Sequence, residues 1–137
     1  SFINIKFNNV KIKGSKGACE DTINLINSIG EIKEIEITEA FSDALDLDFS
    51  KMNINNIFIN GSKNDCADFS FGNYNINRFY LSNCGDKALS VGERSVLTTN
   101  EINITDSKMA IASKDGSIVE VKKNNSQNLE VCLAAYN

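Results

Sequence analysis

Apolar and polar residues alternate along most of this chain, and the alternation recurs at a fixed interval. The segments MNINNIFI (52–59), YNINRFYL (74–81) and LTTNEINI (97–104) share one template, apolar-x-apolar-Asn-x-apolar-x-apolar, with Thr99 at one apolar position. Strict alternation predicts β-strands, because successive side chains of a strand point to opposite faces. The alternation shifts by one residue in the middle of each template. This shift predicts two short strands that meet at a bend.

The template predicts which side chains face the core and which residue forms the bend. The inward residues are Met52, Ile54, Ile57 and Ile59, then Tyr74, Ile76, Phe79 and Leu81, then Leu97, Thr99, Ile102 and Ile104. The bend position holds Asn55, Asn77 and Asn100. Asn tolerates left-handed backbone angles and forms local hydrogen bonds, so it suits a bend. Stacked Asn side chains also bond to one another, so we expect an asparagine ladder rather than a chance abundance of Asn.

The template lies inside a longer repeat of about 22 residues. Rows that start at Asp21, Asp43, Asp65, Asp86 and Lys108 have lengths of 22, 22, 21, 22 and 22 residues, and residues 1–20 form a less regular leading row. Two strands, a bend and a turn in each row describe one coil of a β-solenoid. A coil would bury about six apolar side chains at about 1.5–3 kcal/mol each, against a backbone entropy cost of roughly 1–2 kcal/mol per residue. A lone coil therefore cannot fold, and the sequence predicts an all-β, parallel solenoid of about six stacked coils.

The aspartates that start the rows and residues 18–32 each lead to a separate prediction. The aspartates that start the rows, Asp21, Asp43, Asp65 and Asp86, are expected in turns, where a carboxylate accepts hydrogen bonds from backbone amides. Residues 18–32, ACEDTINLINSIGEI, are the one stretch whose apolar spacing also fits a short amphipathic helix.

The stretch SDALDLDFS (42–50) places several carboxylates on one strand. The alternation predicts that Leu45, Leu47 and Phe49 point inward, as do Ala67, Phe69 and Phe71 one coil later. Asp46 and Asp48 then point outward beside Asp68 and Ser70, between Asn24 and Ser90 in the neighbouring coils. Stacked carboxylates about 4.8 Å apart repel each other by roughly 1 kcal/mol in water. This column is therefore either a solvated strand face or a site that recruits a cation or raises a pKa.

Charge and composition narrow the function. The chain has 14 Lys and Arg against 18 Asp and Glu, a net charge of −4, and no histidine. A nucleic-acid partner is not expected, because nucleic-acid binding needs a basic patch. No apolar run approaches 18 residues, so no membrane span is expected.

The chain has four cysteines, Cys19, Cys66, Cys84 and Cys132. Cys19 and Cys84 would lie three coils apart, too far for a disulfide, and Cys66 and Cys84 about one coil apart but offset along the chain. No pair has zinc-site spacing. We interpret all four as small thiols in the core.

The stretches SDALDLDFS, CGDKALSVGE, IASKDGS and LAAYN resemble repeats of the right-handed parallel β-helices of the pectate-lyase-like superfamily. Similar repeats occur in secreted bacterial proteins, some of which carry a CotH-type (spore-coat-H-like) domain. The resemblance covers residues 40–137. It implies a right-handed solenoid in an extracellular, carbohydrate-rich setting. The length of 137 residues indicates one domain, residues 1–137. The resemblance implies that this domain is the C-terminal part of a longer protein with flanking domains.

Three functions are compatible with these observations. The first is a non-catalytic scaffold or glycan-contacting module that needs no cofactor. The second is a fragment of a polysaccharide-active hydrolase, lyase or epimerase that uses Asp46, Asp48 and Asp68, since the resemblance implies acidic active sites or Ca²⁺ sites on this strand face. Calcium prefers six to eight oxygen ligands, whereas only these carboxylates with Ser70 and Asn24 are available, and Arg78 and Arg94 are expected elsewhere in the coil. The third is a filament of chains stacked end to end, because FINIKF and VCLAAY show no cap.

Overall fold

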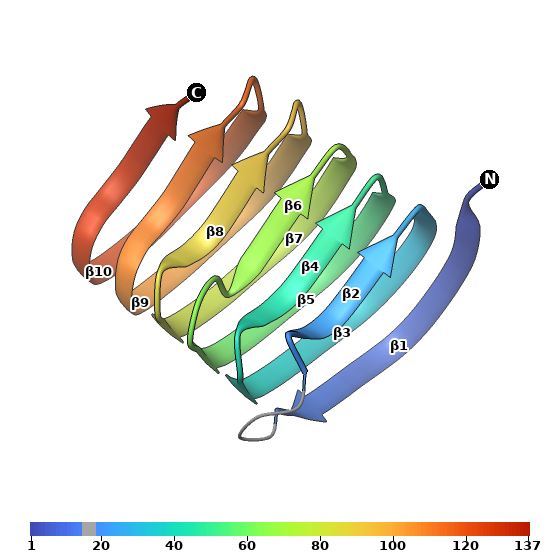
Figure 1. Cartoon of the computed structure of the whole chain (residues 1–137), viewed down its shortest axis with the longest axis horizontal. Helices are drawn as coiled ribbons and strands as arrows, with labels where there is room; N and C mark the ends of the chain where they lie inside the picture. The colour runs from blue at the N-terminus through green and yellow to red at the C-terminus, as the bar shows by residue number, and fades with distance from the viewer. Residues whose placement is uncertain (15–18) are drawn as a thin grey trace.

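The computed structural model describes residues 1–14 and 19–137 and shows a parallel β-solenoid of about six coils (Figure 1). Its ten strands are β1 (Ile3–Lys13), β2 (Asp21–Ile26), β3 (Ser28–Ala40), β4 (Asp43–Asp48), β5 (Lys51–Ser62), β6 (Ala67–Ser70), β7 (Asn73–Cys84), β8 (Lys87–Gly92), β9 (Val96–Lys114) and β10 (Ile118–Tyr136). They form one sheet in the order β1-β3-β5-β7-β9-β8-β6-β4-β2, with β10 paired to β9. All the pairs are parallel, as the repeat predicts.

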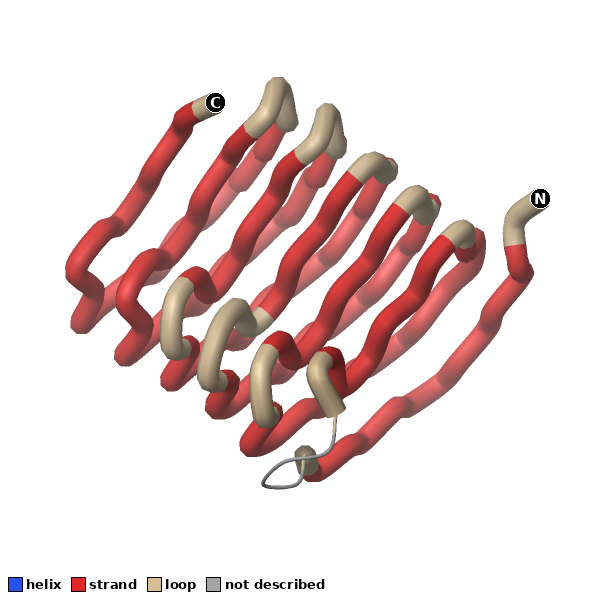
Figure 2. Tube along the Cα trace, in the orientation of Figure 1, coloured by secondary structure: helices blue, strands red, loops and turns tan. Residues whose placement is uncertain are grey.

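The sheet wraps around the core as two walls (Figures 1 and 2). The long-strand wall consists of β1, β3, β5 and β7 with residues 96–106 of β9 and 118–128 of β10. The short-strand wall consists of β2, β4, β6 and β8 with residues 107–114 of β9 and 129–136 of β10. Each coil contributes one strand segment to each wall, so residues about 22 apart in the sequence lie side by side.

The predicted inward residues form the core. All twelve template residues are buried, and Phe69 and Phe79 are the largest fully buried side chains. Leu45, Leu47 and Ala67 are also fully buried. At about 1.5–3 kcal/mol for each large apolar side chain, this continuous column stabilises the stack that a lone coil could not form.

The row that starts at Asp86 is one residue out of register. In the structure Lys87, not Asp86, lies opposite Asp65. The backbone N–H of Lys87 donates to Asp65 Oδ1 at 2.9 Å, just as the N–H of Asp65 donates to Asp43 Oδ1 at 2.8 Å. The spacing from Asp65 to its equivalent in the next coil, Lys87, is therefore 22 residues. The predicted row of 21 residues that starts at Asp65 is wrong. Asp43 and Asp65 therefore accept hydrogen bonds from backbone amides, as expected. In each case the donating amide belongs to the next coil.

The asparagine ladder is confirmed. Asn77 Nδ2 donates to Asn55 Oδ1 at 2.8 Å, and Asn100 Nδ2 donates to Asn77 Oδ1 at 2.9 Å. A second ladder follows beside it, where Asn75 donates to Asn53 at 3.3 Å. The left-handed backbone expected at the first ladder is wrong, because none of its three residues has a positive φ. The strands pass through this bend without interruption.

Left-handed residues form the other two corners of the coil. One column holds Asn27, Phe49 and Phe71, and the other holds Glu39, Gly61, Asn83, Asp106 and Asn128. The inward prediction for Phe49 and Phe71 is therefore wrong. Each ring follows the end of a short strand, and the positive φ, 50° and 51°, turns it out of the core. The two rings stack outside with centroids 4.5 Å apart and remain 47% and 49% exposed.

Serines line the inside of the Phe49 corner, at Ser28, Ser50, Ser95 and Ser117. Gly72 interrupts this column, and the hydroxyl of Tyr74 takes the place of the missing serine. It hydrogen-bonds the carbonyl oxygens of Leu47 (2.7 Å) and Ser70 (2.9 Å). A Cβ atom at position 72 would lie 2.2 Å from Tyr74 Oη, so only glycine fits beside it. Hydroxyl groups thus donate to carbonyl oxygens at this corner in successive coils, from Leu25 and Ile26 to Val91.

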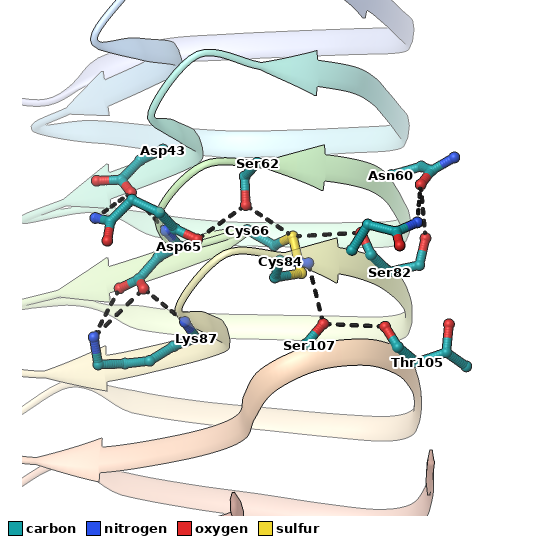
Figure 3. Close-up of a disulfide and its surroundings, with 12 residues drawn as sticks. Asp43, Asn60, Ser62, Asp65, Cys66, Ser82, Cys84, Lys87, Thr105 and Ser107 are labelled. Carbon is teal, nitrogen blue, oxygen red and sulfur yellow. Dashed lines mark hydrogen bonds and ion pairs between the residues drawn. A yellow bond between two sulfur atoms is a disulfide. The ribbon is translucent and has the colours of Figure 1, made fainter. Parts of the chain in front are cut away.

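A disulfide joins Cys66 to Cys84, so the prediction of four core thiols is wrong (Figure 3). Cys84 ends β7 and Cys66 precedes β6, at the same corner of successive coils. Cys66 and Cys84 are 18 residues apart in the sequence, fewer than the 22 residues of a coil. Because the chain turns at this corner, their Cα atoms nevertheless lie 5.4 Å apart. Cys19 and Cys132 are free and exposed, and therefore do not lie in the core either.

Residues 21–32 form β2, a bend at Asn27 and the start of β3, and Cys19 and Glu20 are not helical, so the helical alternative is wrong for residues 19–32. Ala18 lies outside the described residues. Within residues 1–14 and 19–137, no helix could cross a membrane.

The disulfide predicts which cysteines react with an alkylating reagent. In unfolded but unreduced protein, iodoacetamide should modify Cys19 and Cys132 and leave Cys66 and Cys84 linked in one pair of peptides, as read by mass spectrometry. Reduction should lower the free energy of unfolding by about 3 kcal/mol, because the bond closes a loop of 18 residues. Labelling of all four cysteines without reductant would contradict the assignment.

Candidate functional site

The predicted carboxylate column exists on the outer surface of the short-strand wall. Asp46 on β4 pairs with Asp68 on β6, and Asp68 pairs with Ser90 on β8. Asn24 precedes Asp46 in this column, and Asp48 pairs with Ser70 two residues along. The register is the one that the alternation predicts. Asp46, Asp48 and Asp68 therefore lie on one face of adjacent strands.

Hydrogen bonds satisfy only part of this cluster. Asn24 Nδ2 donates to Asp21 Oδ2 at 2.9 Å and reaches Asp46 Oδ2 at 3.4 Å. At the other end of the column, Asp68 Oδ1 and Ser90 Oγ are buried without a hydrogen-bond partner among the described residues. Buried polar atoms usually have partners, so this end of the column is electrostatically costly.

Burial and repulsion from nearby carboxylates raise the pKa values of all three carboxyls. Burial, then Asp48, then Asp21 raise the pKa of Asp46 to about 7. Burial, then Glu93, raise the pKa of Asp48. Burial also raises the pKa of Asp68, although the nearby Lys114 ammonium lowers it in part. Near neutral pH the column can therefore hold a proton in place of one of its negative charges.

The sequence analysis did not predict two charged residues, Glu93 and Lys114, that lie beside the carboxylate column. Glu93 accepts a hydrogen bond from Ser70 Oγ, and the Lys114 side chain lies along Gly92. Glu93 belongs to a corner where two successive residues, Glu93 and Arg94, have positive φ, which the alternation does not signal. Lys114 follows Ser113, the partner of Val91, so a correct register through β9 would have placed it.

The arginines are not part of the column. Arg78 lies on β7 in the long-strand wall, where its Nε is 3.7 Å from Glu101 Oε2, and Arg94 lies at the corner before β9. In the part of the chain that the structure describes, no three His, Cys, Asp or Glu side chains are grouped to hold a metal ion. Calcium binding by Asp46, Asp48 and Asp68 stays a prediction.

A second candidate site, which the sequence reasoning missed, lies on the outer surface of the long-strand wall. Phe58 on β5 and Tyr80 on β7 are paired in the sheet, and their rings stack with centroids 4.6 Å apart and planes 6° apart. They line a hollow of about 570 Å³. The other residues of this aromatic hollow include Glu34, Glu36, Thr38, Asn60, Ser82, Asn103 and Thr105. Phe58 and Tyr80 occupy the same outward position of the template, 22 residues apart. This spacing could have predicted from the sequence that the two rings stack.

The polar rim of the aromatic hollow is held in place by bonds between coils. Asn60 Oδ1 accepts hydrogen bonds from Ser82 Oγ (3.1 Å) and Asn83 Nδ2 (2.7 Å). Asn103 Oδ1 accepts one from Asn125 Nδ2 at 2.9 Å. Fixed amides and hydroxyls beside exposed ring faces can bind a ligand that is apolar on its faces and polar at its edge.

Comparison with protein-family models, with curated proteins and with solved structures finds no match to this chain. The structure establishes a parallel β-solenoid, and the likeness to pectate-lyase-like repeats rests on the stretches quoted above.

The raised pKa of Asp46 predicts how stability changes with pH. The folded chain holds this proton up to about pH 7, whereas the unfolded chain loses it near 3.8. The folded state therefore binds more protons in this window, and its stability falls as the pH rises from about 4 to 7. Asp46→Asn should raise the free energy of unfolding at pH 8 by about 1–2 kcal/mol, after allowance for solvent screening of a half-buried group, and should flatten the pH dependence.

Urea unfolding at a series of pH values between 4 and 8 measures this effect. Glu31→Gln, an exposed position in the long-strand wall, is the matched control and should leave the pH dependence unchanged. Equal slopes for the wild type and Asp46→Asn would show that the carboxyl is not perturbed.

Proposed function

We propose that this solenoid is a non-catalytic module of a larger extracellular protein and that it contacts a neutral polysaccharide at the aromatic hollow. The observation that carries the proposal is the stacked pair Phe58 and Tyr80 within a hollow of about 570 Å³.

The chemistry of the aromatic hollow suits a sugar chain. A pyranose ring has apolar C–H faces and a polar hydroxyl edge. The former can pack on the outer face of either ring of the stacked pair, and the latter can bond to Asn60, Ser82 and Asn103 on the rim. Tyr80 remains 36% exposed, so its ring is accessible to a ligand.

The coils that carry Phe58 and Tyr80 place like groups side by side at the spacing of the strands, about 4.8 Å. Phe58 and Tyr80 stack in one column, and Asn60 and Ser82 stack in the next. A polymer of sugar units lying across the strands would meet the two rings in adjacent coils and a row of hydroxyls and amides, Thr38, Asn60, Ser82 and Thr105, in four successive coils. This repetition favours an extended polysaccharide over a single small sugar.

Charge selects among polysaccharides. Glu34 and Glu36 line the aromatic hollow, and the chain as a whole has a net charge of −4. Like charges disfavour an acidic polymer such as pectate. We therefore expect a neutral β-linked glycan.

The setting is supported by two independent features. The repeats resemble those of secreted right-handed β-helices, and the Cys66–Cys84 disulfide is typical of an oxidising compartment. Both favour an extracellular or cell-surface location.

A second candidate is a polysaccharide-active enzyme fragment that uses Asp46, Asp48 and Asp68. The pKa of about 7 at Asp46 favours it, because a carboxyl that is protonated near neutral pH can act as a general acid. The aromatic hollow lies on the other wall from these carboxylates, which is why we prefer the non-catalytic proposal.

The test is affinity electrophoresis in gels that contain β-1,4-glucan, xylan, mannan or pectate. The wild type should be retarded by at least one neutral polymer and not by pectate. The double variant Phe58→Ala/Tyr80→Ala should bind about tenfold more weakly, since two partly exposed rings contribute on the order of 1.5 kcal/mol.

The matched control is Phe49→Ala/Phe71→Ala, which removes a similar stacked pair outside the aromatic hollow and should not change binding. Equal loss in both double variants would contradict the proposal. Turnover of any of these polymers that disappears in Asp46→Asn would favour the enzyme instead.

A further inference from the structure

The aromatic hollow is acidic on the side where β3 runs beside Phe58. Glu34 and Glu36 lie two residues apart on the outward face of β3, and both are half-buried and line the hollow. β3 and β7 flank β5 on opposite sides, so Glu36 and Tyr80 lie on opposite sides of Phe58. In the described part of the chain, no Lys or Arg lines the hollow. A ligand on the outer face of Phe58 therefore meets carboxylates.

The basic side chains of the same wall are engaged with other carboxylates. Lys11 Nζ lies 2.8 Å from Glu36 Oε1, and Arg78 Nε lies 3.7 Å from Glu101 Oε2. Glu34 forms no ion pair with any other described residue. The Lys11 side chain is 76% exposed, so its pairing with Glu36 contributes little free energy and does not prevent a ligand from sharing Glu36.

A second acceptor beside Glu34 also lacks a donor. Asn56 pairs with Glu34 in the sheet, and its Oδ1 is buried without a hydrogen-bond partner among the described residues. On the other side, Glu34 pairs with Asn9 of β1, which carries no charge. A buried acceptor without a donor costs free energy. This position therefore favours a ligand group that is positively charged and donates several hydrogen bonds.

A primary ammonium fits this position better than a metal ion does. Calcium takes six to eight oxygen ligands, whereas the hollow offers the carboxylates of Glu34 and Glu36. Nor are three His, Cys, Asp or Glu side chains grouped to hold a metal ion within residues 1–14 and 19–137. An ammonium has three N–H donors and needs only a few acceptors. It also gains from the ring of Phe58, because aromatic faces attract cations.

We propose that the aromatic hollow selects β-linked glycans in which some sugars carry a free primary amine. The inference rests on the proposed polysaccharide binding and refines its ligand, which is otherwise uncharged. One sugar packs on the outer face of Phe58 with its ammonium at Glu34, and its hydroxyls reach the row that includes Thr38 and Asn60. A lysine-rich peptide offers the same ammonium but no hydroxyl edge for this row, so the glycan is the better match.

Isothermal titration calorimetry with two hexasaccharides tests the inference. The β-1,4-linked glucosamine hexamer carries an amine on every sugar, and its fully N-acetylated form has the same backbone and none. In a buffer in which the amines are protonated, the wild type should bind the amine form about fivefold more tightly. Added salt should reduce this preference, because it screens the charges.

The outcomes separate this inference from the proposed function. Equal affinity for the two hexasaccharides, with binding still weakened in Phe58→Ala/Tyr80→Ala, would overturn the amine selection and leave polysaccharide binding intact. Absence of binding to both hexasaccharides and to the neutral polymers would overturn both.

Glu34→Gln tests the residue assigned to the ammonium. The amide keeps the size of the side chain and removes its charge, so the affinity for the amine hexamer should fall about fivefold while that for the acetylated hexamer stays unchanged. Glu31→Gln is the matched control, because it removes the same charge from an exposed position of β3 outside the hollow and should bind like the wild type. Equal loss in both variants would show an effect of net charge alone and contradict the assignment.

Lys11→Gln tests the same site by a gain of affinity, which a folding defect cannot produce. Without Lys11, Glu36 has no partner in its column of charges, and the amine hexamer should bind about twofold more tightly. Lys6→Gln, also exposed on β1 but outside the hollow, is the control and should leave the affinity unchanged. A hexalysine peptide should bind more weakly than the amine hexamer. Tighter binding of the peptide that is lost in Glu34→Gln would overturn the glycan as the ligand.

Discussion

Parallel backbone pairing between coils, at a spacing of about 22 residues, constrains every other feature of this protein. It places like residues in columns, so that an apolar position in one coil meets an apolar position in the next. The same pairing stacks the asparagines, where exposed amides replace water as each other's partners. It also stacks carboxylates, and this costs free energy unless a proton or a cation is taken up.

The parts of the fold that follow from alternation were predictable from the sequence. Met52, Ile54, Ile57 and Ile59 face the core as expected, and Asp46 lies beside Asp68 as expected. Alternation describes straight segments only, and the errors fall at the corners. Phe49 and Phe71 leave the core because a left-handed residue reverses the alternation there. The Cys66–Cys84 bond was missed because two positions that are offset along the sequence come together across a corner.

The two candidate sites differ in how visible they are in the sequence. The alternation of Asp46, Leu47 and Asp48 identifies outward carboxylates directly. Their raised pKa values depend instead on burial and on the charges of neighbouring carboxylates such as Glu93, which the alternation does not indicate. Phe58 and Tyr80 read as ordinary strand residues until the register brings their rings into contact. The acidic column is self-repelling and lies apart from the aromatic hollow, while the hollow combines ring faces with fixed amides. The latter arrangement supports binding without turnover more directly than it supports catalysis.

The central claim is that residues about 22 apart pair in parallel around one core. Backbone nuclear Overhauser effects in isotope-labelled protein measure this pairing directly. We expect contacts between the amide and Hα protons of Met52 and Tyr74, and between those of Leu45 and Ala67, which lie in neighbouring parallel strands. Contacts typical of antiparallel hairpins, or the sequential amide contacts of helices over residues 19–32, would contradict it.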